Sequence, residues 1–379
     1  MKFDLSEKQA MMKKLFREFA INEVEPIAAE IDEEERFPEE TVKKMAEIGM
    51  MGIPFESKYG GSDGDTLSYI LAVEELSKVC GTTGVILSAH TSLGCNPIYT
   101  YGSEEQKQKY LIPLASGEKL GAFGLTEPNA GTDAATQQTV AIDEGDFYRI
   151  NGTKIFITNG GYASTYIVFA MTDKSKGNRG ISCFIIDKDM EGFSIGKTES
   201  KLGIKGSSTT ELIFKDIMVP KENLLGPVGK GFRIAMETLD GGRIGIAAQA
   251  LGIAQGSLDQ AVKYVKERKQ FGRPISAFQN TQFTIADLQT KVDAARLLVY
   301  RAAYMKDKKY NFATEAAMAK LFASEVAMEV TTKSIQLHGG YGYTRDYPVE
   351  RMFRDAKITE IYEGTSEVQK MVIASSVLR

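Results

Sequence analysis

The hydrophobic pattern changes twice along this chain, and that order limits the possible folds. Apolar residues follow a helical period up to about residue 118, form short strand-like runs between about 120 and 225, and then return to the helical period. This segregated order excludes the alternating strands and helices of a doubly wound parallel sheet. The sequence predicts an α+β multidomain protein: an N-terminal helical domain (1–119), a middle β domain (120–227) and a C-terminal helical bundle (228–379).

Local signals support both helical regions. Ser6 with Gln9, and Ser103 with Gln106, have the spacing of a capping box, in which two side chains satisfy backbone groups at a helix start. A turn-forming Gly-Pro-Val-Gly segment precedes the last region. After it, amphipathic patterns predict long helices over residues 231–267, 278–307, 313–337 and 366–377.

Composition narrows the class of ligand and the compartment. The formal net charge of −4 provides no positive field to hold nucleic acid or an anionic membrane. The three cysteines are scattered, which predicts buried thiols in a reducing compartment and no disulfide framework. The first residues lack the apolar core of a signal peptide, and no apolar run is long enough to span a bilayer. We therefore expect a cytoplasmic protein without a transmembrane segment.

The sequence has neither GxGxxG after a strand nor GxxxxGK[ST], so a nucleotide cofactor would not be held by a Rossmann unit or a P-loop. Six other segments could carry chemistry. Residues 125–133 (LTEPNAGTD) form a polar loop suited to a heteroaromatic ring or an anion, although a tight turn between strands explains them more simply. Residues 154–161 (KIFITNGG) place Phe156 and Thr158 on one strand face, before a turn typical of a plain hairpin.

Two further segments lie in or after the first long helix of the C-terminal region. Residues 240–243 (DGGR) place two glycines in a helix, and each glycine destabilises the helix by about 1 kcal/mol relative to alanine. Either the close approach of a ligand to the backbone or a helix break would explain them. Residues 267–272 (ERKQFG) form a basic, aromatic and glycine cluster, which ordinary C-capping explains in full.

The last two segments are rich in glycine or precede the final helix. The three glycines of residues 336–343 (QLHGGYGY) would allow the backbone to run close to a planar or anionic group. Alternatively, they form a glycine C-cap followed by a loop. His338 is far in sequence from the other histidine, His90, which argues against a histidine metal site. Within residues 361–369, Ser366 and Gln369 can form a capping box at the start of the last helix. Glu363 then lies in the loop before that helix. A lone loop glutamate is usually solvated.

In this order and layout, the six segments resemble the acyl-CoA dehydrogenase family across essentially the whole chain. The sequence is most similar to the short-chain, butyryl-CoA type of anaerobic bacteria. The resemblance is carried by LTEPNAGTDA, KIFITNGG, TLDGGRIGIAAQALGIA, ERKQFGRP and RDAKITEIYEGTSEVQ. It implies an N-terminal α domain, a middle β barrel-like domain and a C-terminal four-helix bundle.

The resemblance also implies FAD between the β domain and the bundle, with its adenine half reaching a neighbouring subunit of a homotetramer, a dimer of dimers. The residues implied for the flavin ring are Phe123, Leu125, Thr126, Gly131, Thr132, Phe156, Ile157 and Thr158. Those implied for the adenosine and pyrophosphate are Arg268, Phe271, Gln279, Gln336, Leu337, Gly339 and Gly340, with Thr365 and Glu367 at the last helix. Many relatives carry tryptophan at the position of Phe156, and this chain has no tryptophan.

For the reaction, the resemblance makes Glu363 the base that removes the α-proton of an acyl-CoA while hydride leaves the β-carbon for flavin N5. The expected conversion is butyryl-CoA to crotonyl-CoA, or the reverse. The substrate contacts implied are Thr132, Asp240, Arg243, Tyr362 and Gly364. Some relatives carry the base at the position of Gly242, where glycine cannot serve.

Other functions remain open on the sequence. An enoyl-CoA reductase for acryloyl- or aryl-acrylyl-CoA, or a dehydrogenase of longer acyl chains, would share every residue named. An acyl-CoA oxidase is usually longer, with a further helical domain. A CoA-binding helical scaffold would need neither flavin nor a carboxylate at position 363. The redox partner implied is an electron-transferring flavoprotein.

Overall fold

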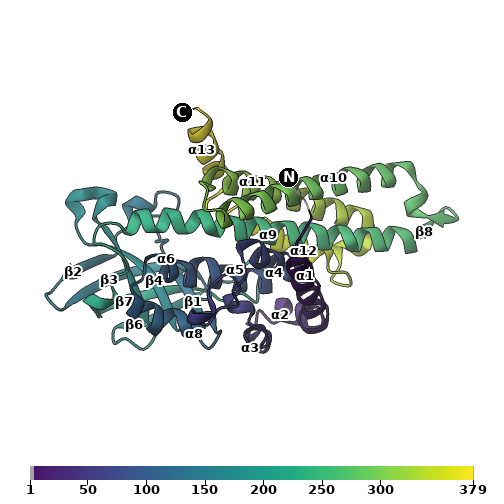
Figure 1. The fold of residues 1–379 in the computed structure, drawn as a ribbon. Coiled ribbons are helices and arrows are strands. Elements are labelled where there is room, and N and C mark those ends of the chain that lie inside the picture. Colours follow the sequence, from purple (N-terminus) through teal and green to yellow (C-terminus); the bar gives the residue numbers. More distant parts are fainter. Residues whose placement is uncertain (1–3, 379) are drawn as a thin grey trace.

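The computed structural model describes residues 4–378, and its secondary structure follows the predicted order of helices, strands and helices. Figure 1 shows the strands gathered at one end of the molecule and long helices that extend to the other end. Within residues 4–378, no helix is long and apolar enough to cross a membrane.

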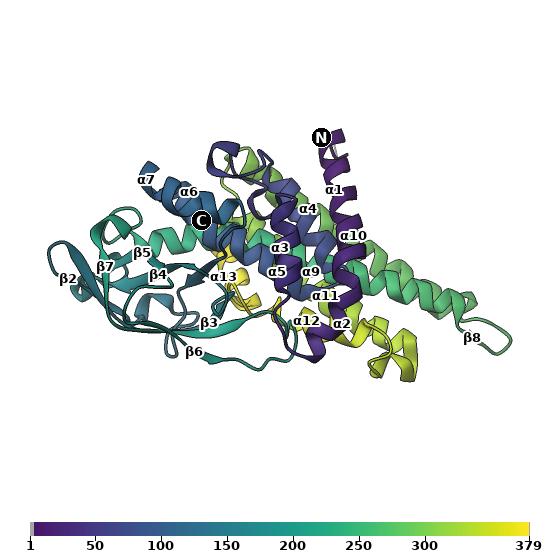
Figure 2. The same cartoon turned by 90° about the horizontal axis from the view of Figure 1, so that it is seen from below.

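The N-terminal region consists of short helices, several joined by single π-helical or 3₁₀ turns. The α-helices are α1 (Glu7–Phe19), α2 (Ala28–Glu33), α3 (Glu39–Glu47), α4 (Thr66–Ser77), α5 (Gly81–Ala89), α6 (Asn96–Tyr101), α7 (Glu104–Gln106) and α8 (Ile112–Ala115). Both predicted capping boxes are confirmed, at Ser6 for α1 and at Ser103 for α7. Figure 2 shows α1 to α5 in the middle of the molecule, between the strands and the far end of the long helices, whereas α6 and α7 lie at the strand end.

The middle region is a seven-stranded sheet with the order β1-β4-β2-β3-β7-β6, in which β5 also pairs with β4. Its strands are β1 (Gly121–Gly124), β2 (Val140–Asp143), β3 (Phe147–Thr158), β4 (Thr165–Met171), β5 (Ile181–Asp187), β6 (Phe193–Thr198) and β7 (Thr209–Pro220). A plain hairpin at residues 159–161 would pair β3 with β4, and that expectation is wrong. Strand β3 pairs with β2 and β7 instead, so the turn carries the chain across the sheet.

The C-terminal region confirms the four predicted helices and adds one. They are α9 (Gly231–Glu267), α10 (Gln279–Asp307), α11 (Ala313–His338) and α13 (Ser366–Val377), and the added helix is α12 (Val349–Ile358). A two-stranded hairpin, β8 (Lys269–Gln270) with β9 (Arg273–Pro274), forms the tip beyond α9. Helix α9 is continuous through Gly241 and Gly242, so no helix break occurs there.

Helix α9 is the central element of the molecule. Residues 241–254 of α9 are all buried, because α11 and α10 cover it on one side and α4 and α5 cover it on the other. Its N-terminal part also lies against β5. In contrast, α13 projects from the helices in Figure 1, and only Gln369 of this helix is buried. In the middle of α9, Ile246 clusters with Val85 of the N-terminal region and Ile204 of the middle region, and Tyr362 of the loop before α13 packs against them, so all three regions meet there.

Candidate active site

Glu363 lies in the short loop between α12 and α13, and side chains hold this loop in an unusual conformation. Glu363 and Gly364 both have positive φ angles, 52° and 93°, which L side chains adopt at a cost. The cap of α13 is Thr365, whose hydroxyl accepts from Val368 N at 3.4 Å. The predicted box of Ser366 with Gln369 is therefore wrong. The Gln369 amide turns back and donates to the carbonyls of Glu363 and Gly364, at 3.3 and 2.8 Å.

The carboxyl group of Glu363 packs on Gly242 in the middle of α9. A Cβ atom built at position 242 would overlap Glu363 Oε2 and would lie 3.0 Å from a methyl carbon of Leu93. Any side chain at position 242 would therefore displace the carboxyl group. The close approach that the sequence left open at DGGR is made by Glu363, and glycine at 242 provides the space.

The electrostatic state of this carboxyl group suits a base. Glu363 Oε2 is buried and has no hydrogen-bond partner within the described residues. Burial raises the pKa of Glu363 to about 8, although the cations of Lys320 and Arg243 lower it in part. An unpaired carboxyl group whose pKa lies near neutral pH can accept a proton from a bound molecule and later release it.

Four of the residues predicted to bind substrate, Asp240, Arg243, Tyr362 and Gly364, lie on α9 or in the loop beside Glu363, whereas Thr132 lies in the exposed loop after β1. Arg243 is buried and pairs with Asp240 at 2.6 Å, while its Nε has no partner in the residues described. Tyr362 donates its hydroxyl to Gln249 of α9, which closes one side of the loop. The free Nε of Arg243 leaves one buried donor for an acceptor atom of a ligand.

At the sheet, Phe156 is presented outwards by a bulge in β3. The pairing shifts between Lys154 with Leu212 and Ile157 with Thr210, so one extra residue is accommodated. Phe156 takes a φ of 59° there and is 59% exposed, whereas Ile157 is buried and Thr158 is half-buried. An aromatic face is thus open beside a hydroxyl group.

The polar loop after β1 is fixed to the same strand by a buried lysine. Lys154 Nζ donates to the carbonyl of Leu125 at 3.1 Å, to Glu127 at 2.7 Å and to Gln137 at 3.0 Å. Backbone hydrogen bonds between Glu127 and Ala130 form the expected tight turn. This turn does not join neighbouring strands, because β1 and β2 are separated by β4.

These residues fit a flat heteroaromatic group such as flavin. Gly131 and Thr132 are exposed, and a Cβ atom at Gly131 would meet no other atom within 4 Å. Leu125 is buried, and Phe123 and Thr126 are half-buried beside them. Together with the exposed ring of Phe156, this loop and strand offer a planar ligand an aromatic face, hydroxyl groups and accessible backbone groups.

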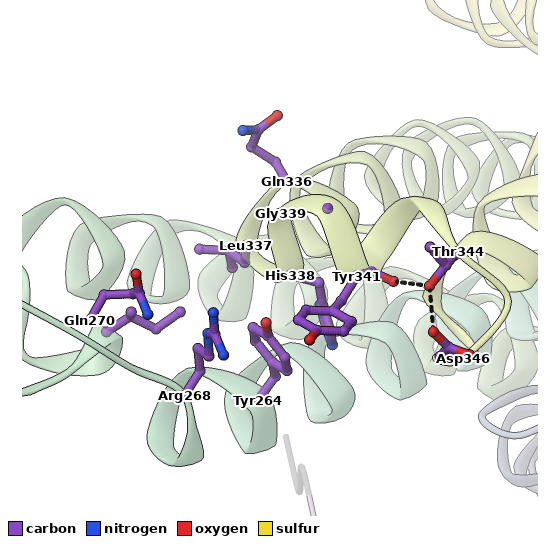
Figure 3. A pocket seen from close by; sticks show the side chains of 12 residues that line it. Tyr264, Arg268, Gln270, Gln336, Leu337, His338, Gly339, Tyr341, Thr344 and Asp346 are labelled. Atoms are coloured by element: carbon purple, nitrogen blue, oxygen red, sulfur yellow. Dashed lines mark hydrogen bonds between the residues drawn. The ribbon is translucent and has the colours of Figure 1, made fainter.

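A cavity of about 500 Å³ gathers most of the residues predicted for the adenosine half. It lies at the far end of α9 and α11, and its lining includes Arg268, Gln336, Leu337, Gly339 and Gly340. Figure 3 shows Arg268 and Tyr264 on one side and Leu337, His338 and Gly339 on the other, with the side chain of Gln336 directed away. The Arg268 guanidinium is 5.7 Å from the ring of Tyr341, so a cation and aromatic surfaces line one space. Both glycines have open space where a Cβ would be, which leaves room for a ligand.

The predicted residues therefore form two groups that one chain does not bring together. Gly242, beside Glu363, and Arg268 are 26 residues apart on a continuous helix, which corresponds to roughly 39 Å. Phe271 at the hairpin tip and Gln279 at the start of α10 are exposed and do not line the cavity. Thr365 and Glu367 lie with the Glu363 loop.

Sequence reasoning missed Lys320 near Glu363 and gave Gln369 a different role. Lys320 in α11 is fully buried and donates to the carbonyl of Gly364 at 2.7 Å, and Gln369 holds the same carbonyl from α13. One signal for Lys320 was available: it falls among alanines on the apolar side of a predicted helix. A lysine at such a position is paired with something when it is buried.

Family models match the chain in three consecutive pieces. The N-terminal, middle and C-terminal domain models of acyl-CoA dehydrogenase match residues 6–118, 122–217 and 229–378. A short-chain specific acyl-CoA dehydrogenase of Clostridium acetobutylicum is 66% identical, with all of both chains covered. The NADH-dependent acryloyl-CoA reductase of Anaerotignum propionicum is 55% identical, over the whole of this chain and 96% of the relative.

Two solved structures share the fold over their whole length. Butyryl-CoA dehydrogenase from Megasphaera elsdenii is 54% identical and superposes with a TM-score of 0.99. A chain from a structure described as the electron transferring flavoprotein of Acidaminococcus fermentans, solved to study flavin-based electron bifurcation, is 59% identical with the same TM-score. Both chains and this chain are fully covered in these superpositions.

Proposed function

The chain belongs to the acyl-CoA dehydrogenase family, and from this premise we propose that Glu363 is its catalytic base. The protein is an FAD-dependent oxidoreductase that dehydrogenates a short-chain acyl-CoA between its α- and β-carbons, as from butyryl-CoA to crotonyl-CoA. The single observation that supports the choice of base is the buried, unpaired Glu363 carboxyl group over Gly242.

In the proposed mechanism, ionised Glu363 removes the α-proton of the bound thioester. The predicted flavin residues would hold FAD, which would supply the acceptor for the hydride that leaves the β-carbon. Negative charge that develops on the thioester oxygen needs a hydrogen-bond donor. The backbone N–H of Glu363 donates to no acceptor in residues 4–378, so it is free for this role.

The other site residues take supporting roles in the proposal. Thr132, Asp240 and Arg243 contact the acyl-CoA, and Tyr362 and Gly364 border the thioester pocket. Arg243 keeps one buried donor for the substrate while Asp240 holds its guanidinium in place. Phe123, Thr126, Gly131, Thr132, Phe156 and Thr158, which are exposed or half-buried, would hold the flavin ring together with the buried Leu125 and Ile157 of the same loop and strand. Thr365 and Glu367 would contact the cofactor from the start of α13.

The adenosine half of the cofactor is held by a second subunit in this proposal. The Arg268 cavity is roughly 39 Å along α9 from Gly242, farther than one FAD in one chain can bridge. Arg268, Phe271, Gln279, Gln336, Leu337, Gly339 and Gly340 then serve the flavin site of a neighbouring copy. A homotetramer built as a dimer of dimers satisfies this requirement.

We further propose an electron-transferring flavoprotein as the redox partner, supported by the Acidaminococcus fermentans structure to which this chain is similar. The three cysteines are buried free thiols, which supports a cytoplasmic location. The proposed domains are residues 1–119, 120–227 and 228–379, with the flavin ring between the second and third.

The test is Glu363→Gln, which keeps the shape and removes the base. We expect the purified variant to retain FAD and to bind butyryl-CoA, while anaerobic butyryl-CoA no longer bleaches the flavin absorbance. Glu325→Gln is the control, since Glu325 makes only a long surface ion pair with Lys370 at 3.7 Å. Substantial bleaching in the Glu363 variant would remove Glu363 from the mechanism.

A second physiological role is the reverse reaction, favoured by the 55% identity to an acryloyl-CoA reductase. In that direction the protonated Glu363 would deliver the proton to the α-carbon, by microscopic reversibility. Reoxidation rates of the reduced enzyme with crotonyl-CoA, acryloyl-CoA and an aryl-acrylyl-CoA separate these roles. Fastest reoxidation by acryloyl-CoA would favour the reductase.

A further inference from the structure

Lys320 is a buried cation without a carboxylate partner. It lies on the inner side of α11 among the buried residues Ala316, Ala319 and Ala323, and it is fully inaccessible to solvent. No acidic group lies within ion-pair distance of Lys320 in the described chain, and its one hydrogen bond is to the carbonyl of Gly364. Burial lowers the pKa of Lys320 to about 8, against the effect of ionised Glu363. Such a placement is costly and requires compensation.

The Gly364 carbonyl is the point where two helices hold the Glu363 loop. It accepts from Lys320 of α11 at 2.7 Å and from Gln369 of α13 at 2.8 Å. Glu363, the residue before this carbonyl, has a positive φ angle, which an L side chain adopts at a cost, so the loop needs such support to keep its shape. The position of the Glu363 carboxyl group over Gly242 depends on that shape.

The charges around Glu363 leave Lys320 with a distinct role. Two cations act on the carboxyl group, and the second, Arg243, is already paired with Asp240. Lys306 is half-buried near Gly241, and Tyr69 and Tyr362 are neutral phenols whose pKa values are raised by burial. The titratable groups that face this region are Tyr69 of α4, Asp240 and Arg243 of α9, Lys306 of α10, Lys320 of α11, and Glu360, Tyr362 and Glu367 beside the loop.

We propose that Lys320 is a positioning residue for Glu363: it fixes the loop through the Gly364 carbonyl, and its ammonium group stabilises the ionised carboxylate. The inference rests on the proposed function of Glu363 as the base. Gln369 shares only the first of these two tasks, because it carries no charge. A comparison of Lys320 with Gln369 therefore separates the support of the loop from the electrostatic effect on the Glu363 carboxylate.

The experiment compares Lys320→Met with Gln369→Met in the FAD-loaded enzyme. The pH profile of kcat/KM is measured from butyryl-CoA-dependent flavin reduction, because its acid limb reports the base of the free enzyme. With Lys320→Met we expect the limb to move up by about one pH unit, since an opposing charge has been removed. This corresponds to about tenfold lower kcat/KM at pH 7. With Gln369→Met we expect a lower plateau and an unmoved limb.

Lys320→Gln provides a second variant that keeps a donor and similar length without the charge, and it should show the same shift. Lys291→Met, which removes a half-exposed surface ion pair with Glu329, should leave the profile unchanged. FAD content and circular dichroism verify that each variant is folded. Equal acid limbs in wild type and both Lys320 variants would overturn the proposal.

A direct readout distinguishes failure of this inference from failure of the proposed function. Isotope-edited infrared titration of glutamate carboxyl groups, with Glu363→Gln to assign the band, follows the ionisation of Glu363 without turnover. We expect the midpoint to rise in Lys320→Gln. An unmoved midpoint together with inactive Glu363→Gln would refute only the role of Lys320. Retained flavin reduction in Glu363→Gln would refute the base itself.

Discussion

At the scale of single residues, the site depends on the missing side chain of Gly242. Gly242 leaves the space that the Glu363 carboxyl group occupies, and no partner in the described chain pairs with Oε2. The carboxyl group is therefore buried enough to have a raised pKa and free enough to reach a substrate. Neighbouring Gly241 has a different role, because it faces the flexible end of Lys306.

Gly242→Ala should displace the base. The added methyl group overlaps Glu363 Oε2, so we expect flavin reduction by butyryl-CoA to slow by about a hundredfold while FAD content is kept. Gly241→Ala is the matched control, because its methyl group meets only Lys306 Nζ at 3.1 Å, which can move. Stopped-flow absorbance measures both. Equal rates in the two variants would show that the Gly242 contact does not position the base.

Glu363→Gln should also change how the stability of the protein depends on pH. The folded protein holds the Glu363 proton up to a pKa of about 8, whereas the unfolded chain releases it near the ordinary value of 4.5. Wild-type stability is thus lost progressively as pH rises across this window, and glutamine has no such dependence. We expect the Tm of the variant minus that of wild type to grow between pH 5 and pH 8 and then level off. A constant difference in calorimetry would contradict the raised pKa.

At the scale of elements, β3 and the loop after β1 act as one unit. The Lys154 ammonium group joins Leu125, Glu127 and Gln137, and the adjacent bulge turns Phe156 outwards. Both members of the Lys154–Glu127 pair are almost fully buried. The ion pair is therefore expected to fix the surface that is proposed to hold the flavin ring.

Lys154→Met should destabilise this unit by about 3 to 5 kcal/mol, because Glu127 is left as an uncompensated buried charge. We expect the protein to unfold at a lower urea concentration and to release FAD earlier. The release of FAD is measured by flavin fluorescence. The double variant with Glu127→Gln should recover part of the loss. Lys197→Met, which breaks an exposed pair with Glu199, should change the midpoint little. Similar midpoints for Lys154→Met and Lys197→Met would contradict the expectation.

At the scale of the whole molecule, the proposed function assigns the two groups of cofactor residues to different subunits. The hairpin beyond α9 projects from the body of the protein, and Phe271 at its tip is 93% exposed (Figure 1). Its position at the end of a projecting hairpin suits contact with a second copy of the chain. A second copy that supplies this tip would complete the flavin site.

Phe271→Asp should weaken assembly and FAD retention together, because it places a charge at the proposed interface. Light scattering measures the mass of the particle, and the ratio of visible to ultraviolet absorbance measures FAD content. Lys174→Asp, an exposed change on the β region, is the control. A fully assembled Phe271 variant that lacks FAD would locate the effect at the cofactor alone. An unchanged mass and FAD content would contradict the shared site.

The sequence by itself determined the order of helices, strands and helices, both capping boxes, the four long C-terminal helices and the family. These depend on periods and motifs that are local in the chain. Only the tertiary structure decided that Glu363 packs on Gly242, 121 residues earlier, and that Lys320 and Gln369 hold its loop. It also replaced the Ser366 box by a Thr365 cap and the hairpin after β3 by a crossover. Burial, charge pairing and strand order are set by contacts between distant segments, and no local pattern encodes them.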